Sequence, residues 1–95
     1  MLTLDPLTHD HFEPLIGQAY LIGETVLTLH DAKLLGHRRT EALRDPFSLL
    51  FCGPQGLRLP QGIYHMKNES LGELEMFITQ VGDGAKGSEF EAIFS

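Results

Sequence analysis

Hydrophobic and polar positions alternate along most of this chain with a period of two, which is typical of β-strands that bury one face. Clusters of glycine, proline, asparagine and aspartate separate the alternating segments and indicate turns. The pattern predicts strands over Ala19–Ile22, Thr25–His30, Phe47–Gly53, Ile63–Lys67, Glu73–Val81 and Glu89–Phe94. We therefore expect a mainly β fold, a six-stranded antiparallel meander that forms a small barrel or a strongly curled sheet.

The start of the chain follows a different pattern, because Phe12 and Leu15 have helical spacing. Thr8 precedes them and is a residue type that favours the N-cap position of a helix. Pro14 is expected to keep the helix short. The sequence therefore predicts one N-terminal helix of about two turns that starts at Thr8 or His9.

The segment Arg44–Tyr64 contains two apolar runs on either side of a loop rich in glycine and proline. This arrangement predicts a β-hairpin. The first run, Phe47–Cys52, is apolar at five of its six positions. A strand that is apolar on both faces needs cover on both sides.

Alternation within each strand assigns one face to the core. The predicted core consists of Leu27, Leu29, Phe47, Leu49, Phe51, Leu74, Met76, Ile78, Phe90, Ala92 and Phe94. The opposite faces carry a second, smaller apolar set formed by Leu50, Cys52, Phe77 and Ile93. Either the N-terminal helix or another protein chain covers this second set, and the sequence leaves both possibilities open.

Composition narrows the class of protein. A length of 95 residues predicts a single domain over positions 1–95. Thirteen acidic and seven basic residues give a net charge of −6, which disfavours nucleic acid and anionic membranes as partners. A single cysteine, Cys52, excludes an internal disulfide, and no secretory signal or long apolar run is present. We therefore expect a cytoplasmic protein.

The candidate metal ligands, nucleophiles and catalytic carboxylates do not form a pattern typical of an active site or a metal site. His9 and His11 are separated by two positions, and on a helix such side chains point about 200° apart, so they would not bind one metal ion together. Cys52 lies within an apolar strand, which suits a structural cysteine better than a nucleophile. Glu73 and Glu75 alternate on a strand face that is typical of solvated carboxylates. We predict no catalytic residue, no metal site and no cofactor, and hence no enzyme.

The loop between Gly36 and Asp45 is polar and basic. It has no interleaved aromatic residues to stack on bases, so a nucleic-acid site is not indicated. Loops often carry recognition residues, which makes the arginines of this loop candidates for contact with a protein partner. The predicted partner contacts are Arg38, Arg39, Leu50, Phe77 and Ile93.

Several motifs occur together along the chain, among them Arg44-Asp-Pro-Phe-Ser-Leu-Leu-Phe51, Leu59-Pro-Gln-Gly-Ile-Tyr64 and Phe90-Glu-Ala-Ile-Phe94. With these motifs the chain resembles, over nearly its whole length, a family of small bacterial proteins catalogued only as a domain of unknown function. The resemblance implies a short β-rich fold and attaches no catalytic residue to it. Because such members are often encoded near proteins that resemble phage tail-collar fibres, the resemblance also implies an accessory or structural role.

These observations predict a non-enzymatic structural or protein-interaction module, an accessory or assembly partner of a phage-tail-like or fibre system. Its expected partner is another protein or a second copy of itself. The alternative is a barrel that binds a small ligand or a carbohydrate, with Tyr20, Tyr64 and His65 as the contact residues. Two tyrosines and no tryptophan make a poor platform for a sugar, so a small-molecule ligand is the second choice.

Overall fold

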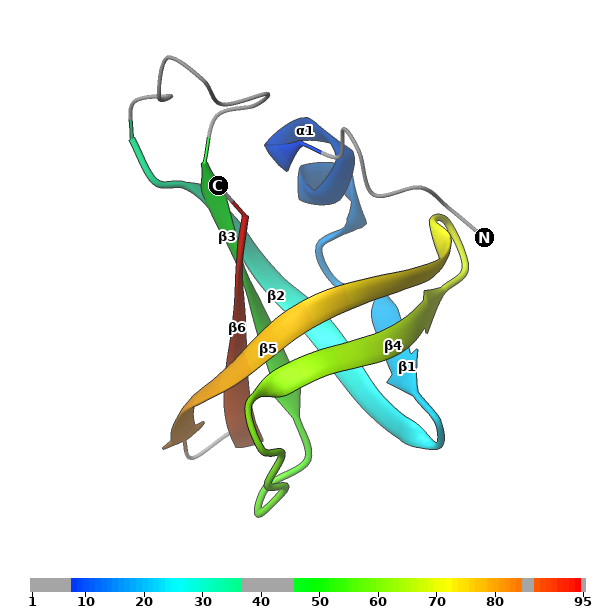
Figure 1. Cartoon of the computed structure of the whole chain (residues 1–95), viewed down its shortest axis with the longest axis vertical. Coiled ribbons are helices and arrows are strands. Elements are labelled where there is room, and N and C mark those ends of the chain that lie inside the picture. Colours follow the sequence, from blue (N-terminus) through cyan, green and yellow to red (C-terminus); the bar gives the residue numbers. More distant parts are fainter. Residues whose placement is uncertain (1–7, 37–45, 85–86, 95) are drawn as a thin grey trace.

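The computed structural model of the chain describes residues 8–36, 46–84 and 87–94. Six antiparallel strands close into a barrel, and one short helix lies at its N-terminal side (Figure 1). The strands are β1 (Ala19–Ile22), β2 (Thr25–Leu34), β3 (Phe47–Gly53), β4 (Gly62–Asn68), β5 (Gly72–Gly84) and β6 (Gly87–Phe94). The predicted barrel and its six strands are confirmed. No helix among the described residues is long and apolar enough to cross a membrane.

The short N-terminal helix that the sequence predicts consists of α1 (His9–Phe12) and a 3₁₀ turn, η1 (Glu13–Leu15). Thr8 is its N-cap residue, with an extended backbone, and its backbone N–H donates a hydrogen bond to Nδ1 of His11 at 2.9 Å. Pro14 lies in the 3₁₀ turn, where its missing N–H costs no helical hydrogen bond. The helix therefore ends after about two turns, as expected.

Phe12 anchors α1 at one end of the barrel (Figure 1). Its ring is fully buried, with its centroid 5.7 Å from that of Phe47 and 5.8 Å from that of Phe94. These two rings stack on each other at 4.7 Å. Because Phe12 packs on residues of the inner face, the helix closes the end of the barrel instead of lying over its outer wall.

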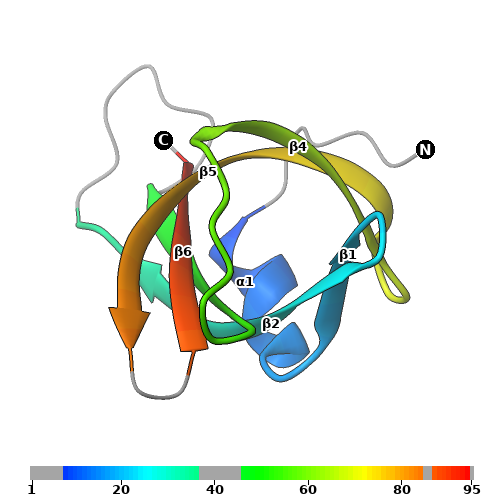
Figure 2. The same cartoon turned by 90° about the horizontal axis from the view of Figure 1, so that it is seen from below.

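The strands follow the order β1-β2-β3-β6-β5-β4, and β4 pairs with β1 to close the barrel. This order departs from a simple meander at one place, because β3 pairs with β2 and β6 while β4 pairs with β5 and β1. The hairpin predicted over Arg44–Tyr64 is therefore wrong. Hairpin loops are typically two to five residues long, whereas the connection Pro54–Gln61 is longer and passes across the end of the barrel opposite α1 (Figure 2).

Two leucines explain why the connection Pro54–Gln61 crosses the barrel end. Leu57 and Leu59 are partly buried and pack against the core. The carbonyl oxygen of Leu57 accepts hydrogen bonds from Ser88 Oγ at 2.7 Å and from Gln80 Nε2 at 3.1 Å. Oε1 of Gln80 accepts the N–H of Leu59 at 3.3 Å. A tight turn would expose both leucines to water, so their burial favours the crossing over the hairpin.

The core matches the strand faces read from the sequence. All predicted core residues are buried except Phe94, which is half-buried and packs against the others. The buried hydrophobic residues that the prediction missed are Phe12, Tyr20, Ala32 and Met66. Tyr20 lies on β1, and its ring meets that of Phe51 edge-on with the centroids 5.2 Å apart. A four-residue strand offers too little alternation to show which of its faces is buried.

Candidate functional site

An exposed apolar patch lies on the outer face of β4, β5 and β6. Ile63 and Phe77 are directly opposite each other on β4 and β5, and they remain 70% and 51% exposed. Ile93 on β6 is 60% exposed. The pairing of β5 with β6 ends at Thr79 and Glu91. Phe77 and Ile93 lie two residues beyond this last pair, on the same outer face. We call Ile63, Phe77 and Ile93 the outer patch.

The structure places the predicted partner contacts unequally. Phe77 and Ile93 are both exposed on the outer face and belong to the outer patch. Leu50 is half-buried on β3, one strand beyond β6. Arg38 and Arg39 lie outside the described residues. Two of the five predicted contacts thus belong to the outer patch in the part of the chain that the structure describes.

The N-terminal helix does not cover the outer patch. Phe12, its one fully buried side chain, packs on the rings at the barrel end. More than half of the surface of Phe77 and of Ile93 stays exposed in the presence of the helix. Ile63 was absent from the predicted contacts, although its alternation with His65 and Lys67 along β4 could have placed it on the outer face.

Carboxylates border the outer patch. Glu75 lies two residues from Phe77 on β5, and Glu91 lies two residues from Ile93 on β6, so both share the outer face with the patch. No ion pair joins either glutamate to another described residue. The border of the patch therefore carries negative charge that a partner could meet.

A hollow of about 200 Å³ lies next to the patch, over β3. It is lined by Asp31, Lys33, Leu35, Ser48, Leu50 and Glu91. Leu50 is paired with Asp31 on one side and with Glu91 on the other, so an apolar side chain stands between two carboxylates. A β-bulge between Leu29 and Asp31 sets this register. We call this feature the β3 hollow.

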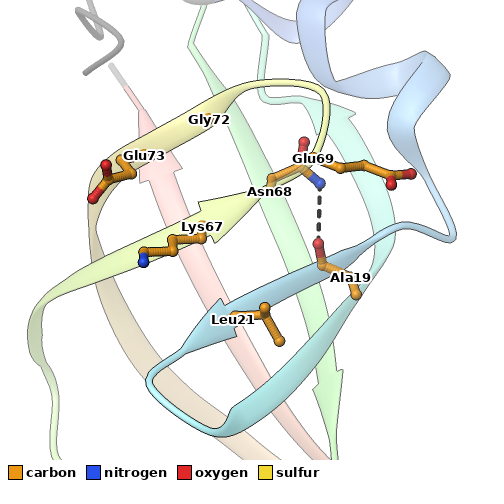
Figure 3. A pocket seen from close by; sticks show the side chains of 7 residues that line it. All are labelled: Ala19, Leu21, Lys67, Asn68, Glu69, Gly72 and Glu73. Carbon is orange, nitrogen blue, oxygen red and sulfur yellow. Dashed lines mark hydrogen bonds between the residues drawn. The ribbon is translucent and has the colours of Figure 1, made fainter.

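A second cavity, of about 530 Å³, lies on the seam between β1 and β4 (Figure 3). It is lined by Ala19, Leu21, Lys67, Asn68, Glu69, Gly72 and Glu73. In Figure 3 the side chains of Lys67 and Glu73 project to one side of this seam pocket and that of Glu69 to the other. Leu21 and Lys67 form the single residue pair between the two strands. The pocket exists because the backbone ladder of the barrel is interrupted here.

Asn68 joins the two strands where the ladder is interrupted. Its Nδ2 donates a hydrogen bond to the carbonyl oxygen of Ala19 at 3.0 Å (Figure 3). It also donates to Oε1 of Gln18 at 3.2 Å. Its Oδ1 accepts the backbone N–H groups of Ser70 and Leu71, both at 2.9 Å. The residue is only 4% exposed. One buried amide thus joins β4 to β1 with its donors and holds the turn between β4 and β5 with its acceptor.

The residues predicted to contact a ligand do not converge. Tyr20 is fully buried inside the barrel, its hydroxyl has no hydrogen-bond partner among the described residues, and this burial raises its pKa to about 12. The hydroxyl of Tyr64 donates to the carbonyl oxygen of Pro60. His65 lies outside the barrel, with Nε2 2.7 Å from Oε1 of Glu73, and this hydrogen bond lowers the pKa of Glu73. The structure forms no common ligand site from these three residues.

Histidines near the N-terminus have structural contacts. Nε2 of His9 lies 3.0 Å from the carbonyl oxygen of Ala32 and donates a hydrogen bond to it. Nδ1 of His11 belongs to the N-terminal cap of α1. Within residues 8–36, 46–84 and 87–94, no group of three or more histidine, cysteine or acidic side chains could hold a metal ion.

Sequence comparison supplies a family for this fold. No match was found among curated proteins, and none was found among solved structures. The family model described as a domain of unknown function, DUF6916, matches residues 7–94, which is nearly the whole chain. The chain therefore belongs to the DUF6916 family.

Proposed function

We propose that this protein is a non-enzymatic protein-interaction module that binds another protein through the outer patch. The exposure of Ile63, Phe77 and Ile93, each more than half open to water on the outer face of three consecutive strands, carries the proposal. Burying apolar surface contributes about 25 cal/mol per Å². Contiguous exposed apolar surface with a polar border is typical of protein interfaces.

The biological role that we propose is that of an accessory or assembly partner in a phage-tail-like or fibre system. The support for this role is the resemblance carried by the motifs of residues 44–51, 59–64 and 90–94. Two of these motifs supply residues of the outer patch, since Ile63 and Ile93 belong to them. The proposed biological role and the outer patch are therefore supported partly by the same residues.

The outer patch is tested with the double variant Phe77→Ser and Ile93→Ser. Both side chains are exposed, so the variant should fold with a melting temperature close to that of the wild type. Central apolar contacts dominate binding energies, so we expect at least about a tenfold loss of affinity. The measurement is affinity capture from a lysate of the native host, followed by titration with the purified partner and light scattering.

Val26→Ser is the matched control. Val26 is 43% exposed on β2, which is three positions away from β5 in the closed strand order. The control makes the same kind of exposed apolar-to-serine change in another part of the barrel and should leave binding unchanged. Equal binding by the wild type and the double variant would show that the outer patch is not the interface.

The seam pocket favours a second candidate function, the binding of a small ligand. Its volume of about 530 Å³ lies within the roughly 300–1,000 Å³ range of small-molecule sites. The lining residues differ from those predicted, and Leu21 is the largest apolar side chain among them. A thermal-shift screen against a metabolite library tests this function. A hit should raise the melting temperature of the wild type but not that of Leu21→Arg, which fills the pocket; a hit that stabilises both proteins equally would contradict it.

A further inference from the structure

We infer that the partner presents an apolar side chain to the outer patch and an arginine side chain to the β3 hollow. This inference rests on the proposed function and deepens it, because it names the chemistry of the partner. It is carried by the position of the hollow next to the patch, by its apolar floor and by the carboxylates on either side of that floor.

The outer patch and the β3 hollow form one surface. Ile93 is paired with Ser48, and Leu50 lies two residues further along β3 on the same face. Strands are about 4.8 Å apart and two residues span about 6.8 Å, so the positions of Ile93 and Leu50 are about 8 Å apart. A single partner segment can reach both with side chains two residues apart on a strand.

The chemistry of the hollow fits an arginine. Leu50 is half-buried and forms an apolar floor on which the methylene groups of an arginine can pack. Asp31 and Glu91 stand on the two strands that flank Leu50, so a planar guanidinium group can donate hydrogen bonds to either side. Oδ1 of Asp31 accepts the N–H of Ala32 at 2.9 Å, which fixes its carboxylate.

Charge favours a basic partner over a second copy of this chain. The chain carries a net charge of −6, and Glu75 and Glu91 border the patch. Two copies that met through this surface would bring like charges together. Among the described residues that line the β3 hollow, Lys33 is the one cation, and two carboxylates outnumber it. The hollow therefore keeps negative charge for a cationic side chain.

The inference is tested with a synthetic peptide, Ac-Thr-Leu-Thr-Arg-Thr-amide, whose leucine and arginine lie on one face of an extended strand. The control peptide replaces the arginine with citrulline, which keeps the shape and removes the charge. Binding is followed by NMR titration of the full chain at millimolar peptide. We expect amide shifts at Leu50, Glu91 and Ile93 with the arginine peptide and clearly weaker shifts with the citrulline peptide.

Three single variants test the charges. Exposed ion pairs typically contribute 0.2–1 kcal/mol, so Glu91→Gln should weaken binding of the arginine peptide by up to about fivefold. Lys33→Met should strengthen binding by a similar factor, because it removes the cation from the hollow. Glu24→Gln is the control: it makes the same change of net charge at an exposed residue of the β1–β2 turn, and binding should be unchanged.

Several results would overturn the inference. With the peptides, these results are equal binding of the arginine and citrulline peptides, or no amide shift at millimolar peptide. With the variants, they are a loss of affinity for the arginine peptide in Glu24→Gln as large as that in Glu91→Gln, or a lower affinity in Lys33→Met. Natural-partner capture separates the two proposals. If the Phe77→Ser and Ile93→Ser double variant loses the partner while Glu91→Gln and Lys33→Met bind it like the wild type, the outer patch is the interface and the arginine contact is refuted. If the double variant keeps the partner, the proposed function fails.

Discussion

Two seams of the barrel are built in different ways. β3 and β6 pair at seven consecutive positions, from Phe47 with Phe94 to Gly53 with Ser88. β1 and β4 pair at one position, Leu21 with Lys67, and the side chain of Asn68 supplies the neighbouring connection. The first seam is a continuous backbone ladder, whereas the second is a short contact completed by side-chain hydrogen bonds.

The two seams produce different surfaces. An uninterrupted ladder keeps outward side chains in regular rows, and between β3 and β6 these rows place Ile93 beside Ser48 and near Leu50, on a surface suited to a protein. An interrupted ladder leaves a gap, and between β1 and β4 this gap is the seam pocket. The two candidate functions of the molecule therefore follow from where its backbone ladder is continuous and where it is not.

Phe51→Ala should have the largest effect, because it opens a cavity beside the continuous seam. Phe51 is fully buried, pairs with Phe90 across β3 and β6, and contacts the ring of Tyr20. Replacing a buried phenylalanine by alanine typically costs about 3–5 kcal/mol. Urea denaturation should show this loss, and hydrogen exchange should speed up throughout the barrel. A melting temperature close to that of the wild type would contradict the placement of Phe51 in the core.

The continuous seam illustrates what the sequence could predict. The apolar run in Phe47–Gly53, the alternation in Glu89–Phe94 and a period of two within each identified both strands and the inward side chains correctly. Alternation is local, so it specified which residues form a strand and which face is buried. It did not specify which strands are neighbours, and the assumption that β3 returns directly to β4 produced the wrong hairpin. Leu57 and Leu59, two apolar residues inside a supposed turn, were the signal of the crossing.

Asn68→Ala should have the next largest effect and should act on the short seam. The variant removes the donor to Ala19 and leaves the N–H groups of Ser70 and Leu71 without their acceptor. Losing the partner of buried polar groups costs about 1–3 kcal/mol. Hydrogen exchange should increase mainly in β1 and β4, while β3 and β6 keep their protection. Uniform acceleration in all six strands would contradict a local role.

Ser70→Ala is the matched control for Asn68→Ala. Its hydroxyl donates to Oε1 of Gln18 at 3.0 Å, so it belongs to the same group of hydrogen bonds, but the side chain is exposed. A net hydrogen bond contributes about 0.5–1.5 kcal/mol, and exposure places Ser70 at the low end of that range. A loss as large as that of Asn68→Ala would show that the buried amide has no special part in closing the barrel.

The candidate sites could be predicted only in part. Phe77 and Ile93 came from alternation, which is enough to place a side chain on the outer face. The seam pocket could not be foreseen, because it depends on how far β1 and β4 run together, and no local pattern encodes the length of a contact between strands distant in sequence. Tyr20 and Tyr64 were chosen as ligand contacts for their chemistry alone. In the structure the ring of Tyr20 packs on that of Phe51, and the hydroxyl of Tyr64 donates to the carbonyl oxygen of Pro60.

Tyr20→Phe should stabilise the protein. The hydroxyl of Tyr20 is buried on the inner side of β1 without a partner among the described residues. Removing such a group should return about 1–2 kcal/mol, since an unsatisfied buried polar group costs about 1–3 kcal/mol. The measurement is urea denaturation at pH 7. An equal or lower stability would indicate that the hydroxyl has a favourable contact in solution.

Tyr20→Phe should also change how the free energy of unfolding depends on pH under alkaline conditions. Burial raises the pKa of Tyr20 from 10.0 to about 12, so the unfolded chain releases this proton at lower pH than the folded chain. Stability is therefore complete below pH 10 and falls as pH rises towards 12, by at most about 1.4 kcal/mol per pH unit from this group. Tyr20→Phe lacks this loss, so the advantage of the variant should grow between pH 10 and 12.

His65→Ala should have the smallest effect on stability, because its pair with Glu73 is exposed on the outer side of the barrel next to the seam pocket. The hydrogen bond from His65 is the main cause that lowers the pKa of Glu73, and the nearby charge of Lys67 is a lesser cause. The pKa of Glu73 should thus rise in His65→Ala and rise less in Lys67→Gln. NMR titration of the Glu73 carboxyl measures both.

The sign of the pH effect follows from the lowered pKa. A carboxyl whose pKa is lower in the folded chain contributes stability above the pKa of the unfolded chain, and this contribution is lost as pH falls through the folded value. In His65→Ala the stability of the fold should therefore depend less on the protonation of Glu73 at acidic pH. At neutral pH the stability should hardly change, because exposed pairs contribute little. If the pKa of Glu73 rises more in Lys67→Gln than in His65→Ala, the carboxylate of Glu73 points towards Lys67 and the seam. An ion pair between Lys67 and Glu73, which are opposite each other on β4 and β5, would then form that wall of the pocket in place of the contact with His65.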